Sequence, residues 1–347
     1  MSGKKVRRAA ASATPWDDVP DHELEPSQRI VAASHRSAYA FRHEAFSGDV
    51  DFLNSYRRDA CPRCGGPATR NGREASGLQR YRCASCGRTF TPATGTIFEG
   101  RKLPIPAWTD FLVQTFSYAS MSLMTREDRR SDTTLPYWMA KLFAVLEGVQ
   151  DDTVLSGRVW IDETYVPEVA GKLWRRPDGK LPRGVSRNQL CIGVGVDESG
   201  KSVFVREGKG HTSTARTWEA FGSRIAPGST LVHDMEHAHG KLVEDLKLKS
   251  EAYNGKVLMG VPDDVNPLFP VNRMCFLLKA FLRSHSGFDR DDLQGYLDLF
   301  HVIVNEPDDK LEKAAFVLDR AMRCPASLRF REFYNVKPRS DAGGSSE

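Results

Sequence analysis

Apolar and polar positions divide the chain into regions with different periodicities. In the middle, two β-branched and aromatic runs, Gly157–Val166 and Ser229–His233, predict buried strands that end close to acidic residues. On either side of these runs, apolar residues recur at intervals of three and four, which predicts helices. Residues 1–27 and 336–347 are polar, and their composition predicts no packed structure.

The same patterns predict the other elements. Helices are predicted within Ser27–Tyr56 and over Pro104–Tyr118, Met121–Arg130 and Thr134–Glu147, the last after a polar cap cluster of Ser131, Asp132 and Thr133. Later come a hairpin of Leu190–Val196 and Ser202–Arg206, a short strand at Ser250–Tyr253, and helices over Ser213–Ile225, His237–Leu248, Val271–Ser284, Arg290–Val304 and Asp309–Met322. The three helices between 104 and 147 fit a DNA-reading helix-turn-helix, and fit equally a small bundle that joins two domains.

Length and composition restrict the class of protein. A chain of 347 residues exceeds one ordinary core, so two or three domains are expected. Hydrophobic residues make up 40% and charged residues 27%, as in soluble globular proteins, and no apolar run approaches the roughly 18 residues that span a membrane. The basic N-terminus lacks the apolar core of a signal peptide. We therefore expect a cytoplasmic protein that does not enter a membrane.

Four of the seven cysteines form two matched pairs. Two residues separate Cys61 from Cys64 and Cys83 from Cys86, and 18 residues lie between the pairs. This spacing is typical of the tetrahedral zinc site of a zinc ribbon, and the glycine after each pair suits a tight turn. A redox-active Cys-x-x-Cys is the alternative, which two matched pairs disfavour. We expect these four cysteines to hold one structural Zn²⁺ per chain.

Basic residues are concentrated around the cysteines. The stretch from Arg57 to Lys102 contains ten basic residues and only three acidic ones. Nine of the ten are arginine, which suits bidentate contacts to phosphate. A solvated surface is the alternative, but this density in one small module favours an anionic polymer as partner. The candidate DNA contacts are Arg80, Arg82 and Arg88 here, and Arg175 and Arg176 in a basic loop predicted over Pro167–Gln189.

Asp162 and Asp234 form the candidate catalytic pair. An acid near a strand end is usually a turn or cap residue. Here, however, three strands, a helix, a fourth strand ending in Asp234 and later helices match an RNase H-like layout, in which the first and fourth strands are neighbours. Asp162 shares a strand face with Trp160, whereas Glu163 points the other way, so only one of the two adjacent acids can serve a given site. Two neighbouring carboxylates favour binding of a hard cation.

A second motif overlaps this site. Residues 233–237 spell H-x-x-E-H, the motif of inverted zinc peptidases, which must lie on a helix so that both histidines reach the metal. Because His233 ends a predicted strand, the motif is disfavoured here. We expect His233, His237 and His239 to be polar neighbours of Asp234 or surface residues.

The sequence resembles a family of bacterial insertion-sequence transposases, the ISXO-like group, which place a zinc ribbon before an RNase H-like DDE integrase domain. The matching stretches run in the same order between Cys61 and about Phe300. They are CPRC…YRCASCGRTFTPATGTIFEGRKLP, VWIDETYV, TLVHDMEHAHGKLV and NPLFPVNRMCFLLKAFLRSHSGFDRDDLQGYLDLF. In the subgroup that this chain resembles most, Asn replaces the third acid and a Lys follows it.

The resemblance implies a role for each matching residue. Asp162 and Asp234 would be metal ligands, Asn272 would take the third catalytic position and Lys279 would be its basic companion. Asn272 and Lys279 lie seven residues apart, on one face of the predicted helix, and Arg283 extends that face as a DNA contact. Without the family match, plain amphipathic packing would explain this helix, with Asn and Lys solvated. Because the Asn carbonyl is neutral, we expect weaker metal binding than with three acids.

The function implied is that of a DNA transposase. It would cleave insertion-sequence ends with Mg²⁺ or Mn²⁺, in a site for two ions, and transfer the freed 3′-hydroxyl to target DNA. The partners implied are double-stranded DNA, as terminal inverted repeats and target, and further copies of the chain assembled on it at the nucleoid. The alternative is a DNA-binding relative without catalysis.

The chain is expected to divide into seven segments. They are a polar N-terminus (1–27), a short helical segment (28–56), a zinc ribbon (57–103), a helical DNA-binding region (104–150), an RNase H-like domain (155–306), a C-terminal helix (307–335) and a polar tail (336–347).

Overall fold

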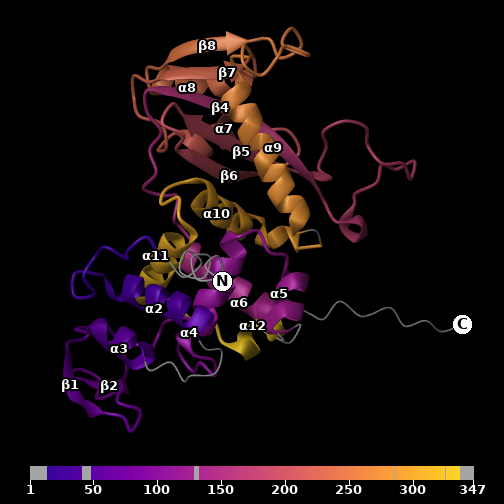
Figure 1. Cartoon of the computed structure of the whole chain (residues 1–347). Helices are drawn as coiled ribbons and strands as arrows, with labels where there is room; N and C mark the ends of the chain where they lie inside the picture. Colours follow the sequence, from indigo (N-terminus) through magenta and orange to yellow (C-terminus); the bar gives the residue numbers. More distant parts are fainter. Residues whose placement is uncertain (1–13, 41–47, 129–132, 286, 325, 337–347) are drawn as a thin grey trace, which may run out of the picture. The chain divides into compact units, whose positions relative to one another are not determined.

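The computed structural model of the chain describes residues 14–40, 48–128, 133–285, 287–324 and 326–336 (Figure 1). It divides into two compact units, one comprising Met1–Leu146 with Pro307–Glu347, the other Glu147–Glu306. The last two residues of the helix predicted over Met121–Arg130 and the predicted cap residues Ser131 and Asp132 lie outside the described residues, as do residues 1–13 and 337–347 of the two polar ends.

The second unit is built on a mixed five-stranded sheet in the order β6-β5-β4-β7-β8. Its strands are β4 (Arg158–Pro167), β5 (Gln189–Asp197), β6 (Ser202–Lys209), β7 (Thr230–Asp234) and β8 (Lys249–Tyr253). β4, β5 and β6 are antiparallel neighbours, whereas β7 is parallel to β4 on one side and to β8 on the other. The first strand of the unit is therefore central and lies beside the fourth. This order confirms the predicted RNase H-like class and the five strands.

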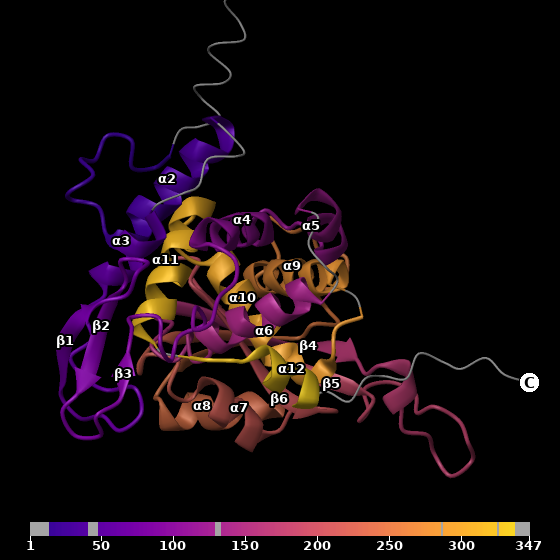
Figure 2. The ribbon, with the colours of Figure 1, turned by 90° about the horizontal axis from the view of Figure 1, so that it is seen from below.

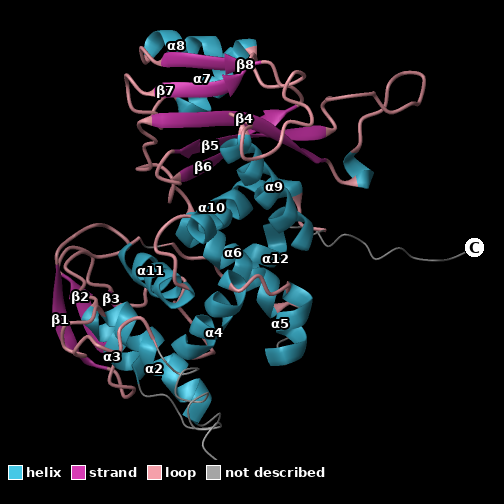
Figure 3. Ribbon diagram, turned by 45° about the horizontal axis from the view of Figure 1, so that its top comes forward, coloured by secondary structure: helices cyan, strands magenta, loops and turns pink. Residues whose placement is uncertain are grey.

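Helices cover both faces of this sheet (Figure 3). On one face, Phe221 of α7 (Thr214–Phe221) and Leu242 of α8 (Gly240–Asp245) pack against Val159 and Ile161 of β4. On the other, α9 (Phe269–Ser284) packs against β4 and β5, and α10 (Leu293–Val304) against β6. Residues of opposite parity along β4 therefore lie under different helices.

Two predicted helices of the second unit begin later than the sequence pattern suggests. The segment from His237 starts with a short 3₁₀ turn, η2 (His237–His239), before α8, and α10 follows a second such turn, η3 (Arg290–Asp292). In η3, Asp289 caps the turn by accepting a hydrogen bond from the backbone N–H of Asp291. Another 3₁₀ turn, η1 (Ala170–Lys172), follows β4.

The first unit combines a three-stranded ribbon with helices. The ribbon strands are β1 (Ala68–Arg73), β2 (Gln79–Cys83) and β3 (Thr89–Phe90), and the helices are α2 (Pro26–Ala40), α3 (Gly48–Ser55), α4 (Ile105–Phe116), α5 (Met121–Asp128), α6 (Thr134–Leu146), α11 (Lys310–Arg323) and α12 (Phe330–Val336). Trp108 of α4 stacks on Trp138 of α6 with ring centroids 4.3 Å apart, and both indoles are buried. The helices predicted between 104 and 147 correspond to α4, α5 and α6 in the described residues, and α4 and α6 pack through this aromatic contact.

The last helices belong to the same packed unit as the first ones. α11 contacts α2, α4 and α6, as Figure 2 shows for α2 and α4, and the hydroxyl of Tyr56 donates to Asp319 on α11 (2.9 Å). The sequence predicted a C-terminal helix over 307–335, whereas the described residues of this stretch contain α11 and most of α12, which ends at Val336. Residues 14–25 also differ from expectation, because turns place Trp16 and Leu24 in buried positions despite the polar composition of the segment.

Candidate active site and four-cysteine cluster

Asp162 and Asp234 lie on the two central parallel strands of the second unit. In the pairing of β4 with β7, Trp160 is opposite Val232. If this pairing is continued by two residues along both strands, Asp162 comes opposite Asp234, and both lie on the same face of the sheet. Asp162 is half-buried and its Oδ1 accepts a hydrogen bond from the backbone N–H of Glu163 (2.8 Å). Asp234 Oδ1 accepts one from the N–H of Glu236 (3.1 Å).

Asn272 faces the same cavity as the two acids. A cavity of about 270 Å³ is lined by Asp162, Asp234 and Asn272, together with residues of the loop that follows β8. The indole of Trp160 fixes this loop by donating to the carbonyl of Pro267 (2.8 Å), next to the start of α9. Asn272 sits in the first turn of α9, across the cavity from Asp162 in the middle of β4 and Asp234 at the carboxyl end of β7. The prediction that the first strand ends close to its acids is wrong, because β4 continues past them to Pro167 in its pairing with β5.

The cavity is electrostatically unfavourable for two ionised acids. Burial raises the pKa of Asp162 to about 7, and the neighbouring carboxylates of Glu163 and Asp234 add to this effect. A cation in the cavity would lower the pKa of Asp162 again, because it stabilises the ionised carboxylate against burial and against the neighbouring acids. The donor set of two carboxylates and one amide oxygen suits a hard divalent ion such as Mg²⁺ or Mn²⁺.

Lys279 and Arg283 lie further along α9, and both are exposed. Lys279 is not among the residues that line the cavity. Phe276, between Asn272 and Lys279 on this helix, is 67% exposed, an unusual position for so large an apolar side chain. The helix is anchored on its other side by buried Val271, Cys275 and Leu278, as amphipathic packing requires.

Two buried histidines lie behind Asp234. The two Nδ1 atoms of His233 and His239 are 3.0 Å apart, and His239 Nε2 lies 3.0 Å from Glu163 Oε1. Burial and His239 lower the pKa of His233 to about 4. For His239, burial acts to lower the pKa, but the hydrogen bond to Glu163 and the nearby acids raise it overall. Sequence reasoning placed Glu163 on the opposite face from Asp162, and this is the face on which it meets His239.

The H-x-x-E-H alternative does not match this geometry. His233 is a strand residue of β7, and both Glu236 and His237 are exposed. The histidine that approaches His233 is His239, which lies outside the motif. A peptidase zinc site on a helix is therefore not formed by these residues.

The four cysteines of the first unit converge on one point. Their sulfur atoms all lie within 4.8 Å of one another, with Cys61 and Cys86 3.8 Å apart and Cys64 and Cys83 3.5 Å apart. Tetrahedral zinc with Zn–S bonds of about 2.3 Å requires sulfur separations of roughly 3.8 Å. The cluster could thus hold one Zn²⁺.

The two cysteine turns have matching backbones. Gly65 donates its N–H to the carbonyl of Cys61 (2.9 Å), and Gly87 does the same to Cys83 (3.0 Å). Both glycines have φ of 70°, a conformation that a side chain disfavours, as expected for the residue after each pair. β2 and β3 flank the second turn, and β1 pairs with β2 although, apart from Thr69, its sequence is polar and poor in strand-forming residues.

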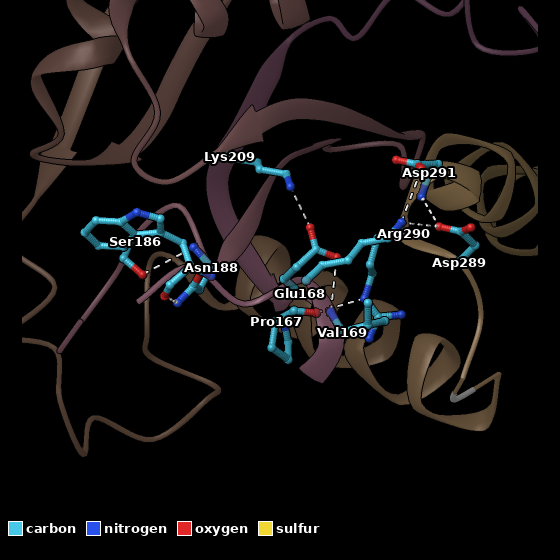
Figure 4. Close-up of polar contacts among 11 residues, drawn as sticks. Pro167, Glu168, Val169, Ser186, Asn188, Lys209, Asp289, Arg290 and Asp291 are labelled. Atoms are coloured by element: carbon cyan, nitrogen blue, oxygen red, sulfur yellow. Dashed lines mark hydrogen bonds and ion pairs between the residues drawn. The ribbon is translucent and has the colours of Figure 1, made fainter. Parts of the chain in front are cut away.

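The arginines chosen as DNA contacts are accessible. Arg82 and Arg88 in the ribbon are exposed, Arg80 is half-buried, and Arg175 and Arg176 are exposed in the loop after β4. This loop is fixed where it leaves the sheet (Figure 4): Lys209 pairs with buried Glu168 (2.7 Å), and Arg290 donates to the carbonyl of Pro167 (2.8 Å). The loop that carries these basic side chains is therefore anchored where it begins, at the end of β4.

The described helices do not include one that is long and apolar enough to cross a membrane. This finding agrees with the absence of a long apolar run in the sequence.

Fold and site together define an RNase H-like domain with acidic residues on its two adjacent parallel strands β4 and β7, and the same chain carries a four-cysteine ribbon. No family model matches the chain. The chain is 26% identical over 256 residues to a Halobacterium salinarum protein described as an uncharacterized protein in transposable element ISH50. The match covers 70% of this chain and 84% of the relative, and confirms the resemblance to proteins of transposable elements.

Two solved structures are also similar to this chain. One is the catalytic domain of Mos1 mariner transposase, 15% identical with a TM-score of 0.28, covering 54% of this chain and 91% of that one. The other is a pre-cleavage Mos1 transpososome, 13% identical with a TM-score of 0.24, covering 54% and 60%. Both TM-scores are below 0.5, and the fold class follows from the strand order instead.

Proposed function

We propose that the protein is a DNA transposase that cleaves the ends of an insertion sequence and joins them to target DNA. One observation carries the proposal: Asp162, Asp234 and Asn272, from three separate elements of an RNase H-like unit, line a single cavity. The similarity to a protein of a transposable element supports it. The four-cysteine ribbon and its arginines, and further copies of the chain, would hold the DNA.

The residues of the cavity fit a divalent metal site. Asp162 and Asp234 would be its anionic ligands, and Asn272 would contribute a neutral oxygen. A bound Mg²⁺ or Mn²⁺ would supply Lewis-acid stabilisation of the attacking and leaving oxygens. Because the third ligand carries no charge, an oxygen of the DNA phosphate would complete the site.

The protein side chains would then position the DNA. The amino end of α9 faces the cavity through Asn272, and the positive end of the helix dipole favours a phosphate there. Lys279 and Arg283, exposed further along α9, would contact neighbouring phosphates of the same strand. In the first reaction, water attacks the scissile phosphate and the 3′-oxygen leaves as a hydroxyl. In the second, this hydroxyl attacks a target phosphate and displaces another 3′-oxygen.

The experiment compares purified wild type with Asp162→Asn and Asp234→Asn on DNA that contains the sequences flanking its gene. Each variant should lower Mg²⁺-dependent nicking at the end by at least about 100-fold, more than loss of a second-shell partner costs, while DNA affinity stays close to that of wild type. Asp245→Asn is the matched control, because Asp245 lies on α8 and pairs weakly with Lys241 (4.0 Å).

The outcomes separate the proposal from its alternative. Wild-type protein that binds these ends but nicks them with neither Mg²⁺ nor Mn²⁺ would indicate a DNA-binding protein without catalysis. Nicking at the wild-type rate by either Asp162→Asn or Asp234→Asn would refute the assignment of the site.

A further inference from the structure

His233 and His239 direct the same ring nitrogen at each other. His233 is the penultimate residue of β7 and His239 ends η2, and their Nδ1 atoms are 3.0 Å apart. The rings are nearly perpendicular, at 80°, so they meet at their edges rather than stack. Both side chains are buried, with His239 0% and His233 6% exposed. Two imidazole lone pairs this close repel each other unless a proton or a metal ion lies between them.

The outer nitrogens of both rings are held by oxygen atoms. His239 Nε2 lies 3.0 Å from Glu163 Oε1, and His233 Nε2 lies 3.0 Å from Ser250 Oγ. An ionised Glu163 can only accept a hydrogen bond, so His239 carries its proton on Nε2 and can present a lone pair at Nδ1. Metal-binding histidines are characteristically fixed in this way, with the second ring nitrogen donating to an oxygen acceptor such as a carboxylate.

Asp234 supplies a third donor at the same place. Its Oδ1 lies 3.8 Å from His239 Nδ1, and one donor atom from each of the three side chains falls within 4.8 Å of the others. Asp234 is also partly open to solvent, with 37% of its side chain exposed. The three donors thus lie together at the carboxyl end of β7, with a route for an ion from outside.

We propose that His233, His239 and Asp234 bind one divalent transition-metal ion, of which Zn²⁺ is the representative. Two imidazoles and one carboxylate suit a borderline ion and disfavour Mg²⁺, which prefers oxygen ligands. Three protein ligands leave a coordination position open for water or an anion. The site shares Asp234 with the proposed active site, but its occupancy can be measured without DNA and does not depend on cleavage.

The experiment counts Zn²⁺ in the full-length protein after saturation and dialysis against excess Mg²⁺. Wild type should retain two ions per chain, one in the four-cysteine cluster and one at the histidines. His239→Gln and His233→Ala should each lose one ion. His237→Ala is the matched control, because His237 is exposed in the same turn and should leave both ions in place.

A titration of wild type with Co²⁺ avoids any variant that fails to fold. One equivalent should show thiolate-to-metal charge transfer, and a second should show only the weak bands of nitrogen and oxygen ligands. One ion per chain in wild type, with no Co²⁺ site beyond the cysteines, would overturn the proposal and leave a shared proton between the rings. Retention of two ions by His239→Gln would also overturn the proposal. So would a second ion that is lost in Asp162→Asn but retained in both histidine variants, because that ion would lie in the active-site cavity.

Discussion

Trp160 of β4 lies opposite Val232 of β7 in the parallel pairing of the two central strands. This single register relationship, continued by two residues, brings Asp162 beside Asp234 although 71 residues separate them in the sequence. A slip of one residue would turn one of the two acids to the opposite face, where Glu163 lies. The candidate site thus depends on strand register as much as on the acids themselves.

The four-cysteine cluster gives the first prediction. Cys64→Ser should remove one Zn²⁺ per chain and unfold the ribbon, because a structural zinc contributes on the order of 10 kcal/mol to the folding of such a module. Elemental analysis measures the zinc, and limited proteolysis within residues 57–103 measures the unfolding. Cys324→Ser is the matched control, since Cys324 is exposed and lies outside the cluster. Full zinc content in Cys64→Ser would contradict the zinc ribbon.

The ribbon arginines give the second. Replacing Arg80, Arg82 and Arg88 together with Ala should reduce the slope of log affinity for DNA against log salt concentration by up to about 2.7, because each lost phosphate contact contributes about 0.9. Fluorescence anisotropy at a series of salt concentrations measures this slope. As a control, Arg57→Ala should change it less, because Arg57 already pairs with Asp59 (2.6 Å). An unchanged slope in the triple variant would place the DNA contacts elsewhere, with Arg175 and Arg176 as the next candidates.

Lys279 gives the third. Lys279→Ala should lower the rate of end cleavage by about tenfold, equivalent to one charge-assisted phosphate contact of about 1.4 kcal/mol, while the Asp162 and Asp234 variants lose far more. Single-turnover nicking assays measure the rate. Arg273→Ala is the control on the same helix, because Arg273 is exposed but turned about 100° from Asn272. Equal losses in the two variants would indicate general charge attraction in place of a specific role for Lys279.

Lys141 gives a prediction about pH. This lysine is buried in α6 and donates to the carbonyl of Ile97, and burial lowers its pKa to about 8. Between pH 8 and about 10.4, the unfolded chain binds this proton and the folded protein does not, so stability rises with pH. The melting temperature of wild type minus that of Lys141→Met should therefore increase from pH 8 to pH 10. A difference that stays constant or falls would show that Lys141 is protonated in the folded protein throughout.

The sequence by itself determined the features that depend on local spacing. The distance between the cysteine pairs predicted their cluster, because four thiolates around one ion impose short, regular intervals. Hydrophobic periodicity predicted the five strands of the second unit and the helices that follow them, since buried faces repeat with the period of each element. The strand layout predicted Asp162 and Asp234 as a pair, and the family resemblance added Asn272.

Only the tertiary structure decided which of these residues meet. Glu163, His233 and His239 form one buried network, yet nothing in local periodicity links a residue on β4 to a turn more than 70 residues later. The position of α11 among the first helices was equally invisible, because an amphipathic pattern shows that a face is buried but not against which partner. Such pairings are set by packing and register across the whole chain, which are long-range properties that no short stretch of sequence contains.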